Sequence, residues 1–137
     1  MYEKPLPVVD ADTRPFWEAA RRHRFLIQYC LSCERYVFYP RALCPHCHSD
    51  RLEWREASGE GTIYSFTVSR RPAGPGFEDD VPYVVAIVEL EEGPRMMSNV
   101  VVEDVGEVRI GEQVRVLFED VTDEISLPKF ELIRSER

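Results

Sequence analysis

The stretch that decides the fold is CLSCERYVFYPRALCPHC, from Cys30 to Cys47, and it contains every cysteine of the 137-residue chain. The four thiols form two Cys-x-x-Cys pairs, Cys30 with Cys33 and Cys44 with Cys47, separated by ten residues. Two cysteines at this spacing can turn both sulfur atoms toward one point, and two such turns bring four sulfur atoms together. Zinc prefers a four-coordinate sulfur cage where its role is structural. The spacing therefore predicts a metal site, occupied by zinc or by iron in the same cage.

The residues beside the cysteines bear on the geometry and the role of this site. Residues 34–43, which include YVFY, favour a short β-hairpin that brings one Cys-x-x-Cys turn opposite the other. Glu34 and His48 follow the two pairs, at positions where glycine often permits a left-handed turn. A closed sulfur shell leaves no open coordination position, so we expect the ion to stabilise the structure and not to catalyse.

Other uses of these residues remain open. Four cysteines could form disulfides, or one Cys-x-x-Cys pair could serve as a thioredoxin-like redox site at a helix start. His46 or His48 could also replace one cysteine as a metal ligand.

Charge and composition restrict the classes of partner. The net charge is −8, and nucleic-acid affinity rests on neutralising phosphates with Lys and Arg, so polyphosphate partners are disfavoured. No apolar run is long enough to span a bilayer, and the N-terminal MYEKPLPVVDADTRPF lacks the pattern of a secretory signal. We therefore expect a cytoplasmic chain that does not enter a membrane. The cytoplasm keeps thiols reduced, which favours metal binding over disulfides.

Residues 10–30 predict one helix followed by a strand. Asp12 or Thr13 can cap the helix, and Pro15 suits its first turn because the missing N–H has no partner there. The apolar residues of the helix favour a face buried in the internal core over one that binds a partner. They are Phe16, Trp17, Ala19 and Ala20.

The C-terminal part of the chain alternates as short strands do. GEGTIYSFTVSRR predicts a half-buried strand with Ile63, Ser65 and Thr67 on one face, opposite Tyr64, Phe66 and Val68. Four more strands follow in PYVVAIVELEEG, RMMSNVVVED, IGEQVRVLFED and SLPKFELI, the first two as a hairpin. Five short strands with glycine at the corners favour a closed barrel, for which the OB-fold is the best-known solution.

These elements predict a mostly β protein with an N-terminal helix, a rubredoxin-like zinc ribbon and a C-terminal five-stranded OB-fold barrel. We place the helix and its lead-in strand at 1–29, the zinc ribbon at 30–55 and the barrel at 56–137. The segment RRPAGPGFEDDVP, residues 70–82, joins the first two barrel strands. In an OB-fold this loop is a customary binding element, so it is either functional or merely mobile.

A catalytic set is missing from the sequence. The cysteines are committed to the metal, and no Gly-x-Ser-x-Gly, His-Glu-x-x-His or phosphate-loop motif occurs. Lys129, in LPKFEL, is one of two lysines, and no second cation or apolar pocket that would make it a Schiff-base amine is evident. The chain is therefore expected to have no catalytic residues of its own.

The order of the motifs resembles the zinc-ribbon and OB-fold family that accompanies thiolase-like enzymes, once filed as a domain of unknown function. The resemblance covers essentially the whole chain, and all four ribbon cysteines are kept. It rests on the ribbon, Gly-x-Gly-Thr at 59–62, Pro-Tyr-x-x-Ala-x-Val-x-Leu at 82–90, Ile-Gly-x-x-Val at 110–114 and Pro-x-Phe at 128–130.

This resemblance implies a non-catalytic accessory subunit of an enzyme complex that acts on acyl-CoA. Members of the family accompany thiolase-superfamily proteins: a thiolase with hydroxymethylglutaryl-CoA synthase, steroid side-chain aldolases, or enzymes that degrade aromatic compounds. It implies an α2β2 heterotetramer with such a partner, an enoyl-CoA hydratase as a further partner, and acyl-CoA as the shared substrate. Arg70, Arg71 and Phe77, in the long loop, are our candidates for contact with CoA or the partner.

Two other classes of function remain as alternatives. A zinc ribbon and an OB-fold could form a module that binds single-stranded nucleic acid, against which stand the charge of −8 and the lack of a basic stripe with aromatics. The chain could also be a stand-alone acyl-CoA-binding enzyme, which would require a reactive group that the sequence does not reveal.

Overall fold

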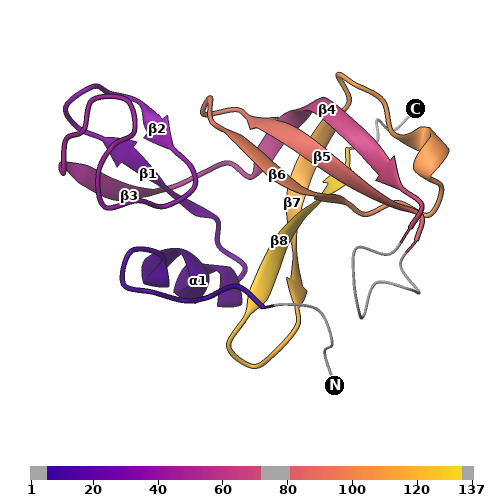
Figure 1. Ribbon diagram of the computed structural model, residues 1–137, viewed down its shortest axis with the longest axis horizontal. Helices are drawn as coiled ribbons and strands as arrows, with labels where there is room; N and C mark the ends of the chain where they lie inside the picture. The colour runs from indigo at the N-terminus through magenta and orange to yellow at the C-terminus, as the bar shows by residue number, and fades with distance from the viewer. Residues whose placement is uncertain (1–5, 72–80, 134–137) are drawn as a thin grey trace.

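The computed structural model describes residues 6–71 and 81–133. They form a small sheet, a barrel and one N-terminal helix that packs against both (Figure 1). Among these residues no helix has the length and apolarity needed to cross a bilayer. The elements are α1 (Arg14–Arg21), β1 (Leu26–Cys30), β2 (Tyr36–Val37), β3 (Leu52–Glu56), β4 (Glu60–Ser69), β5 (Tyr83–Leu90), β6 (Arg95–Val100), the 3₁₀ turn η1 (Val105–Glu107), β7 (Gln113–Asp120) and β8 (Ser126–Leu132).

Helix α1 begins where its sequence predicts, but neither Asp12 nor Thr13 caps it with its side chain: the Thr13 hydroxyl accepts from the Asp10 N–H instead. Thr13 is the N-cap residue, and Pro15 lies in the first turn. The helix ends at Arg21, and His23, two residues later, has φ of 58°, which lets the Arg24 N–H donate to the Ala19 carbonyl, as in a Schellman motif. All four apolar residues named for this helix are buried, so the expected internal core face is confirmed.

Strands β2, β1 and β3 form the ribbon sheet in that order. The expected hairpin inside 34–43 is wrong: β2 pairs with β1, with Tyr29 opposite Tyr36, so the Cys30–Cys33 turn is itself the hairpin loop. The physical reason is the buried Gln28 amide. Its Nε2 donates to the Arg41 carbonyl over 2.9 Å, and the Arg41 N–H donates to its Oε1 over 2.8 Å. This clamp holds the later half of the segment to β1.

The five expected barrel strands are confirmed, and they close in the order β4-β5-β6-β8-β7. All pairings are antiparallel except β6 with β8, which are parallel and meet at Val100 and Phe130. The barrel interior contains Ile63, Val88 and Val114, each no more than 1% exposed. One core cluster joins these residues to Phe16 of α1, so the helix and the barrel share a hydrophobic core.

Strand β4 departs from simple alternation. The register shifts between Ile63 and Ser65, where a β-bulge inserts Tyr64. Ile63 is buried, Tyr64 and Ser65 are both exposed, and Phe66 packs against the core. The expectation that Tyr64 shares a face with Phe66 is therefore wrong, because the extra residue reverses the alternation after Ile63.

The Gly-x-Gly-Thr motif marks two close approaches of the backbone at the start of β4. Gly59 has φ of +82°, and a Cβ there would lie 2.7 Å from Val116 Cγ1. At Gly61 a Cβ would lie 2.6 Å from the Glu89 carbonyl oxygen, on the neighbouring strand β5. The second contact is with backbone, which cannot rotate away, so Gly61 allows β4 and β5 to pair at the barrel corner.

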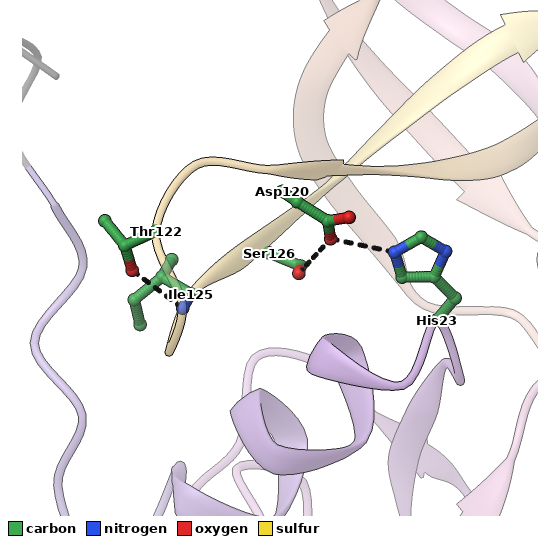
Figure 2. A network of polar contacts seen from close by, with 5 residues as sticks. All are labelled: His23, Asp120, Thr122, Ile125 and Ser126. Atoms are coloured by element: carbon green, nitrogen blue, oxygen red, sulfur yellow. Dashed lines mark hydrogen bonds and ion pairs between the residues drawn. The ribbon is translucent and has the colours of Figure 1, made fainter. Parts of the chain in front are cut away.

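A polar network ties the end of α1 to the β7–β8 hairpin, which extends beside the helix (Figures 1 and 2). His23 Nε2 lies 2.8 Å from Asp120 Oδ1, and the Ser126 hydroxyl donates to the same oxygen. The His23 ring also stacks on Phe118 of β7, with 5.3 Å between ring centroids. The Ser126 hydrogen bond and then the His23 contact hold the pKa of Asp120 below its usual value.

We expect Gly61→Ala to lower the free energy of unfolding by about 1–3 kcal/mol in urea titrations, because the added methyl group meets the Glu89 carbonyl. Gly111→Ala is the matched control: at Gly111 φ is +93° but a Cβ would meet no atom within 4 Å, so the variant carries backbone strain without a clash. Equal stability of Gly61→Ala and the wild type would contradict the close approach.

Asp120→Asn should lower the melting temperature at pH 7. Because the folded-state pKa of Asp120 lies below that of the unfolded chain, about 3.9, its contribution exists at higher pH and disappears as the pH falls through the folded-state value. The difference between variant and wild type should therefore shrink below about pH 4. Asp123→Asn, in the same hairpin turn and exposed, is the control. A difference that persists at pH 2 would exclude this role.

Candidate metal centre

The four cysteine sulfur atoms meet in one cluster, all within 4.8 Å of one another. Two close approaches each join one thiol of each turn: Cys30 Sγ lies 3.6 Å from Cys47 Sγ, and Cys33 Sγ lies 3.7 Å from Cys44 Sγ. Zn–S bonds of about 2.3 Å in a tetrahedron require sulfur atoms about 3.8 Å apart. The donor set and its spacing therefore fit a tetrahedral metal ion.

The two turns that carry the cysteines have matching backbone hydrogen bonds. In the first turn the Glu34 N–H donates to the Cys30 carbonyl, and in the second the His48 N–H donates to the Cys44 carbonyl. Cys30 ends strand β1, so the sheet fixes the first turn directly. The ribbon thus presents two copies of one local structure that face each other.

The residues that end the two turns both occupy the left-handed region, with φ of 58° at Glu34 and 65° at His48. This conformation is uncommon outside glycine, although asparagine, aspartate and histidine adopt it more often than other residues, so Glu34 is the more unusual of the two. Glycine would be the natural choice, as the sequence pattern indicated, yet the geometry of the turn is kept here with bulkier residues. Convergence of the sulfur atoms therefore imposes a local strain on the backbone.

Backbone N–H groups point at the sulfur atoms and favour the thiolate form. The Cys33 N–H lies 3.5 Å from Cys30 Sγ, and this contact above all lowers the pKa of Cys30 to about 7. Burial raises the pKa of Cys33 to about 12, because the charged form loses its hydration and lies beside other thiols. A dication would relieve this crowding of negative charge, since metal ligation needs deprotonated sulfur.

The alternatives for the cysteines are not supported by the geometry. Each of the four is a free thiol, and among the described residues the group of clustered ligand atoms contains no histidine. His46 and His48 are exposed. The four-cysteine set is thus the arrangement that the structure brings together.

The other candidate residues lie elsewhere. Arg70 and Arg71 follow the end of β4 and are exposed, and Phe77 lies outside the described residues. Lys129 lines an apolar cavity that sequence analysis did not find, because its walls come from α1, the segment after β2, β6 and β8. Its Nζ lies 2.8 Å from Glu119 Oε1, an ion pair that does not suit a Schiff-base amine.

Sequence analysis also missed the contact between His23 and Asp120, which are 97 positions apart. Ser126, His23 and Asp120 are the residue types of a catalytic triad, but their contacts are not arranged as nucleophilic catalysis requires. Ser126 and His23 both contact the same Asp120 oxygen, so the histidine is not placed as the base of the serine. The network joins the helix to the barrel.

Comparison with known proteins agrees with this architecture. Residues 17–53 match the family model of the ChsH2 rubredoxin-like zinc ribbon domain, and residues 54–119 match that of the ChsH2 C-terminal OB-fold domain. A DUF35 domain-containing scaffold protein of Methanothermobacter thermautotrophicus is 40% identical over 105 residues, which are 76% of this chain and 78% of that protein.

Longer proteins also match. A probable enoyl-CoA hydratase alpha subunit of Thermomonospora curvata is 38% identical over 93% of this chain. The 3-oxo-4,17-pregnadiene-20-carboxyl-CoA hydratase alpha subunit of Mycobacterium tuberculosis is 34% identical over 85% of it. The chain spans 39% and 37% of the length of these two relatives.

Among solved structures, a chain of the Ltp2-ChsH2(DUF35) aldolase superimposes with a TM-score of 0.81 and 37% identity, over 93% of this chain and 98% of that one. A DUF35 protein of unknown function from Sulfolobus solfataricus shares the fold, with a TM-score of 0.65 and 14% identity over 91% of this chain and 87% of that one. The expected family and fold are thus confirmed: this chain belongs to the DUF35 family, with a ChsH2-type rubredoxin-like zinc ribbon followed by an OB-fold barrel.

Proposed function

We propose that this chain is a non-catalytic accessory subunit that binds and supports a thiolase-superfamily enzyme acting on acyl-CoA thioesters. The observation that carries the proposal is the match, over nearly the whole chain, to a chain of the Ltp2-ChsH2(DUF35) aldolase. Because that aldolase is named for two components, one of them with this fold, we infer that the fold takes part in assembly with an enzyme. The substrate class follows from the relatives that are named for CoA thioesters.

The names of the other relatives support a role in binding. Three archaeal relatives, 31–40% identical, are named scaffold proteins, and this chain covers 67–78% of their length. The two hydratase relatives are named alpha subunits. We infer that the ribbon and barrel unit serves other proteins by contact, whether separate or as part of a longer chain.

The chemistry of the described residues is consistent with a partner that supplies the reactive groups. Acyl transfer or carbon–carbon cleavage needs a nucleophile or a base placed beside the thioester. In residues 6–71 and 81–133 the thiols are gathered in the ribbon, and His23 is held by Asp120.

We further propose that Cys30, Cys33, Cys44 and Cys47 bind one zinc ion. A closed sulfur shell makes this ion a structural centre that holds the two turns of the ribbon together. The ion would replace the disulfides or the larger core that so small a sheet otherwise needs.

The finer points of the assembly are proposals as well. We propose an α2β2 heterotetramer around a symmetric partner dimer, with an enoyl-CoA hydratase as a further partner, in the reducing cytoplasm, where thiols stay free to ligate the metal. Arg70, Arg71 and Phe77 are the candidates for contact with CoA or the partner. An Arg fork suits the CoA phosphates, and both arginines are exposed.

Purified protein should contain about one zinc ion per chain by elemental analysis, and a strong chelator should remove it with loss of ribbon structure. We expect Cys44→Ser to lower the zinc content and the melting temperature, because it removes a buried ligand. Ser32→Ala, beside the same site but exposed, should keep the zinc. Iron in the cage would correct the identity of the metal, and a metal-free chain with unchanged stability would refute the site.

Coexpression with the thiolase-like protein of the same gene cluster should yield a stable complex with two copies of each chain, measured by light scattering after size exclusion. The isolated chain should turn over no acyl-CoA, because its sequence shows no recognised catalytic motif, whereas the complex should be active. Carbon–carbon cleavage or condensation by the isolated chain would overturn the proposed function.

A further inference from the structure

A cavity of about 270 Å³ opens where α1, the segment after β2 and barrel strands β6 and β8 meet. Trp17 and Leu127 contribute to its walls. Two large apolar side chains that also line the cavity are exposed: Tyr39 at 38% and Met97 at 68%. Every part of the fold contributes a wall, so the shape of this cavity exists only when ribbon, helix and barrel are packed together.

The walls are rigid on the side of the helix and the ribbon. The ring of Phe16 lies 4.9 Å from that of Trp17, 5.7 Å from that of Phe38 and 6.0 Å from that of Tyr39, measured between centroids. Each pair is edge-to-face, the favoured geometry of aromatic contacts. Met97, on the barrel side, is flexible and polarisable. Aromatic and methionine side chains are enriched in protein interfaces.

Most polar groups of the cavity are already paired within the chain. The Ser98 hydroxyl donates to the Pro128 carbonyl, and the Asn99 amide donates to the Val84 carbonyl. Lys129 differs, because an ammonium group has three donors and the structure gives it one partner, Glu119. Its side chain is only 15% exposed. Trp17 Nε1 also differs, because it is buried and has no hydrogen-bond partner among the described residues. An occupant of this cavity therefore meets apolar walls and donors from Lys129 and Trp17, which complement an oxygen acceptor.

The volume of the cavity favours a protein side chain over a drug-sized ligand as its occupant. Sites for drug-sized ligands measure about 300–1,000 Å³, so an acyl-CoA is too large for this one. A larger groove of about 800 Å³ lies between the ribbon and the barrel, but it is lined by ionised groups of both signs, such as Glu34 and Arg35. That groove presents donors and acceptors of both signs, whereas the smaller cavity presents spare hydrogen-bond donors, on Lys129 and Trp17.

We propose that this cavity is the socket for the enzyme partner: an apolar side chain from a partner loop fills it, and a carboxylate or backbone carbonyl beside that side chain accepts from Lys129. The inference rests on the proposed function, and it identifies the surface that docks. A single apolar anchor in a desolvated pocket, ringed by weaker contacts, is the usual centre of a protein interface.

The test measures the dissociation constant between the purified, zinc-loaded chain and its purified thiolase-superfamily partner. Met97→Glu should weaken binding at least tenfold, because it places a charge over the apolar mouth and offers Lys129 an acceptor of its own. Lys129→Met should weaken binding about tenfold, the range of a lost hydrogen bond to a charged group. Ile110→Glu is the matched control, since Ile110 is 69% exposed and does not line the cavity. The dissociation constant of this variant should stay within twofold of the wild-type value.

The outcomes are separable. If the wild-type chain fails to bind the partner, the proposed function fails, and this inference fails with it. If the wild type binds and Met97→Glu binds equally well, with unchanged melting temperature and zinc content, the socket is wrong while the proposed function stands. Dissociation of a dimer of this chain by Met97→Glu, at constant partner affinity, would assign the surface to a second copy and overturn the inference.

Discussion

The structure depends on the convergence of four sulfur atoms from two short turns. Otherwise the tips of the ribbon are joined by hydrogen bonds such as the 2.8 Å contact between the Ser32 and Ser49 hydroxyls. The ribbon sheet has three strands, one of them only two residues long. The buried residues around the cysteines form a small cluster of Cys30, Val37 and Cys44, separate from the main core. Hydrophobic burial of this extent is too small to stabilise an independent unit, so the metal ligands have to supply the difference.

The main core has the opposite character, because it joins α1, β1 and all five barrel strands. Phe16 and Trp17 of α1, Ile27 of β1 and Phe130 of β8 belong to one cluster. The helix therefore links the ribbon to the barrel, with the contact of His23 and Asp120 at its end. A subunit that works by shape needs this rigidity, since a surface built from three elements is defined only if the elements keep their places.

Much of this arrangement could be predicted from local patterns. The ligand spacing, the helix with proline in its first turn and the five alternating strands are all short-range signals, and each corresponds to an element of the structure. The predictions that were wrong concern places where contacts between residues distant in sequence override the local pattern. The Gln28 amide moves the ribbon hairpin, and the bulge at Tyr64 turns that ring outward. The cavity beside Lys129 could not be predicted, because its walls come from four separate segments of the chain.

The parallel contact between β6 and β8 determines where the barrel deforms most easily. Its register contains one residue pair, Val100 with Phe130, supplemented by the Val101 N–H that donates to the Phe130 carbonyl. The antiparallel neighbours are joined along most of their length. Where few backbone hydrogen bonds cross, separation costs least, so this seam is the weakest line of the cylinder. The seam runs beside Ser98, whose side chain reaches across it to Pro128. A molecule that pressed on this side of the barrel would thus meet the part of the wall most able to adjust to it.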